Sequence, residues 1–288
     1  MSGAERIVFG TDLVSIGMFR CPPDHAAFPG GLVDDWLIVF PRTAVRIERA
    51  EAPPIVADPT VAVLYDPPSP YRRYLVDPRG DLCDYFAVDS SITEELSSVV
   101  GADVTQRFRE GHRRAESTVY LSQRRLFDLA VGEDADPVAI EEGVLGMALA
   151  VLSAGGEAEA PAPHRAATRA RHRDLALDTA EFLGSSFTQP LRLSEIALQV
   201  GSAPHHLTRI FKRYTGMSIH ERITELRLKR ALEILGDGDS DLARLAIDLG
   251  FSSHSHFSRA FKTAFGLSPS RYRTEQPKPR TIVQAVAS

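Results

Sequence analysis

The stretch LARLAIDLGFSSHSHFSRAFKTAFGLSPSRYR, residues 242–273, decides the fold of the C-terminal half of this chain. Its first part carries an apolar helical stripe that runs into Gly250, and its second part places Phe257 and Phe261 on one helix face. Two short helices joined by a glycine-containing turn form a helix-turn-helix unit. The stretch therefore predicts one such unit, whose second helix has a polar and basic outer face.

The same pattern occurs about fifty residues earlier in the chain. Ile196 to Gly201 matches Leu245 to Gly250 at an offset of 49, whereas Thr208 to Lys212 matches Ser258 to Lys262 at an offset of 50. We therefore expect two units, with one extra residue in the second turn. Between them, residues 219–235 share one apolar stripe and predict a single helix about 25 Å long. With its flanking helices, this rod could set two recognition helices about one DNA turn, roughly 34 Å, apart.

Glycine and serine mark the ends of these predicted helices. Gly216 and Gly266 suit the left-handed residue that follows a helix, and Ser218 and Ser268 suit the N-cap of the next helix. Pro269 suits the first position of a helix. We therefore expect each unit to end at its glycine and to be followed by a further helix.

The charge of the chain is distributed unevenly. Met1 to His164 contains 14 Lys and Arg against 26 Asp and Glu, a net charge of −12, whereas Arg165 to Ser288 contains 19 against 12, a net charge of +7. All four lysines lie in the basic half. A polyanion such as double-stranded DNA is expected to dock there.

Length and composition favour a modular, soluble protein. The chain has 288 residues, enough for about two domains, and 43% of them are hydrophobic and 25% charged. Its longest apolar run is far shorter than the roughly 20 residues that span a bilayer, and residues 7–19 are too interrupted for a signal peptide. We therefore expect a cytoplasmic protein without membrane contact.

The predicted fold class is α+β with several domains. Residues 155–170 are small and Pro-containing, without an apolar stripe, as is typical of a linker. The expected division is a sensor and dimerisation domain over 1–154, a linker over 155–170, a DNA-binding domain over 171–275 and a flexible tail over 276–288.

The acidic half shows short apolar runs separated by turn formers such as Pro29-Gly30-Gly31 and Pro53-Pro54. This pattern is typical of an antiparallel sandwich or barrel, and we expect a barrel. The predicted strands are Leu13 to Phe19, Trp36 to Phe40, Ala44 to Ile47, Val61 to Tyr65, Tyr71 to Val76 and Leu82 to Val88.

Two amphipathic helices are expected after the strands, over residues 117–131 and 137–153. The second is apolar around much of its circumference, which favours packing on more than one surface. We expect these helices to form a homodimer interface, with Leu145 and Leu149 in the contact. The same stripes could instead cover the barrel.

The cysteines and histidines indicate neither a disulfide framework nor a metal centre. Cys21 and Cys83 are the only cysteines, and Cys83 is interpreted as a small buried hydrophobe rather than a redox group. The acidic half contains only His25, His112 and His164, which are widely separated. We expect no metal and no cofactor.

The two helix-turn-helix units resemble a known protein family. Arg173 to Arg273 resembles the DNA-binding domain of the AraC/XylS family of bacterial transcription regulators. The resemblance rests on the glycines, the Ser-Arg-x-Phe-Lys run at 258–262 and the closing Ser-Pro-Ser-Arg-Tyr-Arg at 268–273. It covers about a third of the chain.

The resemblance implies that both second helices enter adjacent major grooves of DNA. Arg suits a bidentate contact with guanine, and His, Ser and Thr donate to or accept from base edges. The implied base-reading residues are His205, Thr208, Arg209, His254, Ser255, Ser258 and Arg259. The implied phosphate contacts are Lys212, Arg213 and Lys262.

The acidic half resembles the cupin-type sensor and dimerisation domain of the same family. The resemblance rests on the strand pattern followed by two helices, on residues 19–23 and on the segments at 71–73 and 80–83. It implies a homodimer, a small-molecule effector of unassigned identity and RNA polymerase as a partner.

Two functional classes remain. The favoured one is a non-enzymatic transcription regulator, expected to be an activator, whose N-terminal domain biases the DNA-binding domain. The alternative is a bifunctional enzyme with a catalytic barrel fused to a DNA-targeting domain. No Gly-rich phosphate loop, Gly-x-Ser-x-Gly elbow or zincin motif occurs in the sequence, which favours the regulator and implies no catalytic residues.

Overall fold

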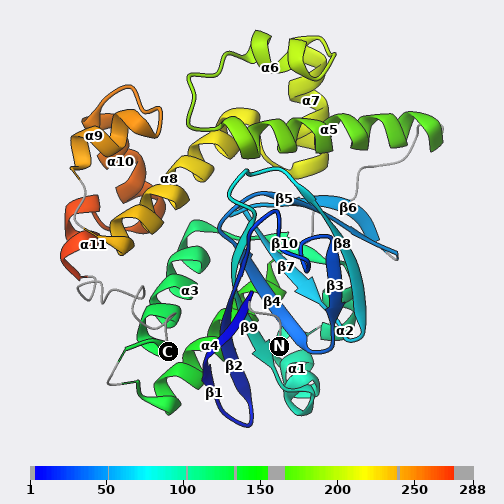
Figure 1. Cartoon of the computed structure of the whole chain (residues 1–288), viewed down its shortest axis with the longest axis vertical. Helices are drawn as coiled ribbons and strands as arrows, with labels where there is room; N and C mark the ends of the chain where they lie inside the picture. The colour runs from blue at the N-terminus through cyan, green and yellow to red at the C-terminus, as the bar shows by residue number, and fades with distance from the viewer. Residues whose placement is uncertain are drawn as a thin grey trace.

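The computed structural model describes residues 4–50, 52–101, 103–132, 135–154, 166–238 and 241–275. An N-terminal part rich in strands is followed by a part made only of helices (Figure 1). We name these the sheet domain, up to Ala154, and the helical domain, from Ala166 onward. The predicted tail and most of the predicted linker, up to residue 165, lie outside the described residues, and residues 166–170 are helical.

The strands form two antiparallel sheets. The six-stranded sheet has the order β1-β2-β9-β4-β7-β10 and the four-stranded sheet the order β3-β8-β5-β6. All six predicted strands are present, but the closed barrel that we expected is two separate sheets. The bounds are β1 Glu5–Gly10, β2 Val14–Cys21, β3 Gly30–Val33, β4 Trp36–Pro41, β5 Val45–Arg49, β6 Ala52–Ala57, β7 Val61–Tyr65, β8 Ser69–Leu75, β9 Asp81–Val88 and β10 His112–Arg114.

Two segments that we interpreted as turns are strands. Pro53-Pro54 lies inside β6, and Gly30-Gly31 begins β3. Both strands are edges of the four-stranded sheet. An edge strand tolerates proline because one side of its backbone has no hydrogen-bonding neighbour.

The burial of strand β7 shows that the six-stranded sheet is covered on both faces and lies at the centre of the domain. All five of its residues are buried. Ala62 and Leu64 pack with the helices on one face of the sheet, whereas Val63 and Tyr65 pack toward the four-stranded sheet on the other. A continuous apolar run instead of an alternating one is the pattern of a strand that is covered on both faces.

Four helices of the sheet domain follow the last long strand. They are α1 Thr93–Val100, α2 Val104–Arg109, α3 Ser117–Ala130 and α4 Pro137–Ser153, of which only α3 and α4 were predicted. Asp136 caps α4 by accepting from the backbone N–H groups of Val138 and Ala139. Ile140, Val144 and Ala148 of α4 are buried in the same cluster as the outer face of the six-stranded sheet.

The helical domain contains both predicted helix-turn-helix units. Its helices are α5 Ala166–Ser186, α6 Leu193–Gln199, α7 Pro204–Thr215, α8 Ile219–Asp237, α9 Leu242–Asp248, α10 His254–Phe265 and α11 Pro269–Glu275. The first helices of the two units start 49 positions apart and the second helices 50, which confirms the extra residue in the second turn. In Figure 1, α8 runs between the group of α5 to α7 and the group of α9 to α11.

The predicted helix ends are confirmed. Gly216 has φ +70° after α7 and Gly266 has φ +78° after α10, a left-handed conformation that costs glycine little. Ser218 and Glu221 form a reciprocal capping box at the start of α8. Each unit therefore ends where a residue without Cβ permits the chain to turn.

Candidate nucleic-acid interface

Helix α7 has one buried and one exposed face. Leu207, Ile210 and Phe211 are buried and hold the helix against the domain. His205, Thr208 and Arg209 are exposed. Because positions three and four apart share a helix face, these three polar side chains form one outward-facing group. The structure places the three predicted base-reading residues of the first unit together.

Helix α10 repeats this arrangement. Phe257, Phe261 and Phe265 are buried, and neighbouring rings in this series contact edge to face, with centroids 5.7 and 4.6 Å apart. The predicted base-reading residues His254, Ser255 and Arg259 are exposed and Ser258 is half-buried.

The predicted phosphate contacts lie further along the same helices. Lys212 and Lys262 are exposed, while Arg213 is half-buried. Lys262 lines a surface hollow together with Ser258 and Arg259. A basic side chain therefore stands beside the base-reading candidates of the second unit, at a place where a phosphate could approach.

Helix α8 contacts the sheet domain through a stripe of charged residues that sequence analysis did not single out. Arg222, Glu225, Lys229 and Glu233 are spaced at helical intervals, and Arg222, Lys229 and Glu233 are buried. Such a stripe normally faces water. Here it faces the sheet domain. The helical spacing of the four charged residues was the only signal in the sequence that could have indicated this contact.

Each member of the stripe has a partner in the sheet domain. Arg222 pairs with Asp58, the Lys229 ammonium donates to the carbonyl of Ala115 at 2.6 Å, and the Tyr120 hydroxyl donates to Glu233 at 2.7 Å. Arg114 pairs with Glu225 at 2.6 Å. Burial lowers the pKa of Lys229, and the carboxylate of Glu225 beside it opposes that effect.

A second polar cluster connects this stripe to strand β9. Asp84 of β9 is fully buried and accepts from Arg20 at 2.9 Å and from Arg124 of α3 at 2.8 Å. Burial would raise the pKa of Asp84, but the nearby cations Arg42, Arg124 and Arg20 bring it to about 2. The Arg42 Nε lies 3.4 Å from Asp84 and 3.7 Å from Glu233 of α8.

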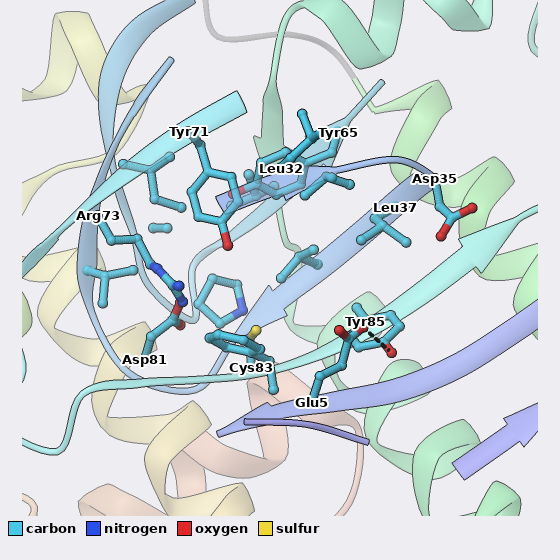
Figure 2. Close-up of a pocket in the computed structure, with 18 of the residues that line it drawn as sticks. Glu5, Leu32, Asp35, Leu37, Tyr65, Tyr71, Arg73, Asp81, Cys83 and Tyr85 are labelled. Carbon is cyan, nitrogen blue, oxygen red and sulfur yellow. Dashed lines mark hydrogen bonds and ion pairs between the residues drawn. The ribbon is translucent and has the colours of Figure 1, made fainter. Parts of the chain in front are cut away.

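The two sheets enclose a cavity of about 270 Å³ (Figure 2). Asp81, Cys83 and Tyr85 of β9 line it, whereas Asp84 between them faces the arginines on the opposite side. Successive side chains of a strand point to opposite faces. One strand therefore touches both the cavity and the polar cluster that leads to α8.

Among the described residues, no group of three or more His, Cys, Asp or Glu is arranged to hold a metal ion. Cys21 and Cys83 are buried, free thiols. Within the same part of the chain, no helix is long and apolar enough to span a membrane.

Comparison with known proteins places the helical domain in a family. A model of a helix-turn-helix domain matches residues 196–275. The Msm operon regulatory protein of Streptococcus mutans is 35% identical over 95 residues, which is 33% of this chain and 34% of that protein. The probable transcription factor PqrA of Proteus vulgaris is 33% identical over 91 residues, 32% of this chain and 75% of that protein.

The chain belongs to the AraC/XylS family. An AraC-type DNA-binding domain structure from Chromobacterium violaceum is 28% identical, covers 38% of this chain and 99% of its own, and has a TM-score of 0.35. The ToxT structure from Vibrio cholerae is 13% identical, covers 91% of this chain and 98% of its own, and has a TM-score of 0.36. The match spans about a third of the length of the first curated AraC/XylS relatives.

Proposed function

We propose that this chain is a non-enzymatic, sequence-specific DNA-binding transcription regulator whose helices α7 and α10 enter adjacent major grooves. One observation carries the proposal: the second helix of each helix-turn-helix unit buries its aromatic and aliphatic face and exposes its polar face. Arg209 and Arg259 lie on these exposed faces, where a guanidinium suits a bidentate contact with guanine.

The length of α8 supports the use of both units on one DNA molecule. Its 19 residues correspond to about 28 Å at 1.5 Å per residue. The reading helices lie directly before and shortly after this rod, so their separation is compatible with one turn of DNA, roughly 34 Å. The surplus of basic residues from Arg165 onward favours the attraction of the phosphate backbone.

We further propose that the sheet domain senses a small effector in its cavity and transmits occupancy to α8. Strand β9 lines the cavity with Cys83 and Tyr85 and contacts the arginine cluster with Asp84. Arg42 connects that cluster to Glu233 of α8. A ligand that shifts β9 would therefore change contacts on the helix that joins the two reading units.

In this proposal the sheet domain is the cupin-like sensor. It also offers a surface for self-association. Leu145 and Leu149 of α4 are half-buried and lie next to the exposed Val138 on one side of the helix. We propose this strip as the homodimer contact. In the cytoplasm, the DNA-bound dimer would present its remaining surface to RNA polymerase.

Selection of binding sites from random duplexes by the full-length protein, followed by hydroxyl-radical footprinting, tests the DNA-reading function. We expect a selected sequence with two protected regions about 10 base pairs apart and an affinity at least about 1,000 times that for unselected DNA. The Arg209→Ala/Arg259→Ala double variant should lose this preference. Arg6→Ala, at an exposed position of β1, is the matched control. Equal affinity for selected and unselected DNA would reject the function.

A further inference from the structure

The cavity between the sheets opens at the two edge strands. Among its lining residues, Glu5, Leu32, Asp34 and Asp35 are exposed, and they belong to β1, β3 and the loop after β3. Strands β1 and β3 are the edges of their sheets. The mouth therefore lies where the sandwich is not closed.

The mouth is acidic and the interior carries no net charge. Glu5, Asp34 and Asp35 are three carboxylates at the opening. Deeper inside, Arg73 is the only cation among the lining residues, and its guanidinium donates to Asp81 at 2.5 Å and to the carbonyl of Ala27 at 2.6 Å. The Arg73 charge is therefore neutralised by Asp81 and does not offset the carboxylates at the mouth.

The walls are apolar and phenolic. Leu37, Val39, Val63, Tyr65 and Tyr71 line the space between mouth and interior. Leu32, at the rim, is 57% exposed and adds apolar surface at the opening. These surfaces suit a flat, apolar group rather than a sugar.

Two buried polar groups on these walls make no hydrogen bond with any described residue. Tyr65 is only 4% exposed, and neither its hydroxyl nor the thiol of Cys83 has a partner in the part of the chain that the structure describes. Burial raises the pKa of both groups well above its ordinary value, so both stay protonated. Tyr65 lines the cavity, so its hydroxyl can hydrogen-bond to a molecule bound there.

We propose that this cavity binds an organic cation, an ammonium group carried on a small aromatic body. The proposed ring would lie between the apolar walls beside Tyr65 and Tyr71, and the ammonium would point to Glu5 and Asp35 at the mouth; Figure 2 labels these four lining residues. Glu5 accepts from the Tyr85 hydroxyl through Oε1 at 2.7 Å, so its second oxygen is available to the ammonium. A carboxylate ligand would be repelled by the three acids.

The size of the cavity limits the ligand. An apolar cavity of about 150 Å³ holds a benzene molecule. A space of about 270 Å³ therefore accommodates one ring with a short chain. The biological role of such a ligand rests on the proposed sensing function. Its binding to the cavity can be measured directly.

The test uses three compounds that share a ring and a three-carbon chain and differ in charge: 3-phenylpropylamine, 3-phenylpropanol and 3-phenylpropanoate. Titration calorimetry with the full-length protein should show that the amine binds at least about tenfold more tightly than the alcohol, with no binding of the carboxylate. Equal binding of the amine and the alcohol, or no binding of the amine at millimolar concentration, would overturn the proposal.

Variants locate the ammonium. Glu5→Gln/Asp35→Asn should weaken binding of the amine about tenfold and leave that of the alcohol unchanged, because Gln still accepts from Tyr85. Asp12→Asn, an exposed position outside the cavity lining, should leave both affinities unchanged. An amine affinity that the double variant does not alter would overturn the assignment. Binding of every sample to selected DNA is also measured. Protein that binds selected DNA but does not bind the amine would reject only the ligand class. Protein without preference for selected DNA would reject the DNA-reading function.

Discussion

Arg222 donates from both Nε and Nη2 to one carboxylate oxygen of Asp58, at 3.1 and 2.7 Å, across 164 positions of sequence. Arg222 belongs to α8, and Asp58 lies in the turn between β6 and β7. The second oxygen of Asp58 accepts from the backbone and the hydroxyl of Thr60. Both partners are buried, so this ion pair holds the helical domain on the sheet domain without contact with water.

Removal of the charge on Asp58 should therefore destabilise the protein strongly. Asp58→Asn keeps the shape and an acceptor for Thr60, but it leaves the buried guanidinium of Arg222 without a counter-charge. We expect a loss of about 3 kcal/mol in the free energy of unfolding, measured by urea denaturation. The control is Glu181→Gln, which breaks the partly exposed pair with Arg46 and should cost less than about 1 kcal/mol. Similar small losses in both variants would contradict the assignment.

Asp84 predicts how stability depends on pH. Its pKa in the folded protein, about 2, lies below the ordinary value of 3.8, so its contribution is present above about pH 4 and is lost as the pH falls toward 2. The difference corresponds to about 2 kcal/mol at neutral pH. Unfolding free energies of the wild type and Asp84→Asn should differ most near neutral pH and approach each other below about pH 3. A constant difference over that range would argue against the depressed pKa.

Arg259 should distinguish one DNA sequence from another. It is exposed on α10 opposite Phe257 and Phe261, so it points outward from the unit. Arg259→Ala should cost about 1 to 3 kcal/mol at the selected site and change non-specific affinity little. Binding isotherms on both DNAs decide this, and an equal loss on both would identify Arg259 as an electrostatic contact.

Lys262 should behave differently, although it lies less than one helical turn from Arg259. If Lys262 contacts a phosphate, Lys262→Ala lowers the affinity for selected and unselected DNA together. The slope of log affinity against log salt concentration should flatten by about one charge. Titrations at several salt concentrations measure this slope, and an unchanged slope would exclude the contact.

Leu145→Glu should shift the protein toward monomer in sedimentation experiments and weaken binding to DNA with paired sites. Association with a second copy would remove water from the new carboxylate, which would lie in the strip with Leu149 and Val138. This desolvation makes the free energy of association less favourable. Ala139→Glu, at an exposed position on another side of α4, is the control and should sediment like the wild type. A folded Leu145→Glu protein that still self-associates would refute the interface.

A fragment from Ala166 onward should fold by itself and bind DNA more weakly than the whole protein. It contains its own helix caps and the buried aromatic cluster of Phe257, Phe261 and Tyr272. Without the sheet domain, Lys229 regains water and its pKa should return toward the ordinary value. Circular dichroism without helical signal would reject the domain boundary.

Local pattern was sufficient to predict most elements of the fold. Apolar stripes, left-handed glycines and serine caps mark α6 to α11, because each depends on neighbours within a few residues. The same reasoning missed β6, since its two prolines indicate a turn unless the strand lies at an edge. It also missed β10, whose sequence His112-Arg113-Arg114 contains no apolar residue.

Contacts between distant segments could not be predicted in this way. The exposure of most of the candidate reading residues of α7 and α10 was predictable, because exposure follows from helical spacing. Lys229 was counted among the four lysines of the basic half, where DNA was expected to dock, yet it is completely buried against Ala115 and Tyr120. The local sequence does not distinguish a charged side chain that faces water from one that contacts a domain more than a hundred positions away in the sequence.

The single helix α8 sets the order of the binding reaction. If α7 and α10 enter adjacent grooves as proposed, one chain is sufficient to occupy both, because one polypeptide carries both helices on either side of this rod. Occupancy of one such site should then follow a simple saturation curve in the free protein concentration, without cooperativity. A steeper response would require two sites bridged by self-association. The sharpness with which a promoter responds to the amount of this protein would thus be determined by how many copies of the site it contains.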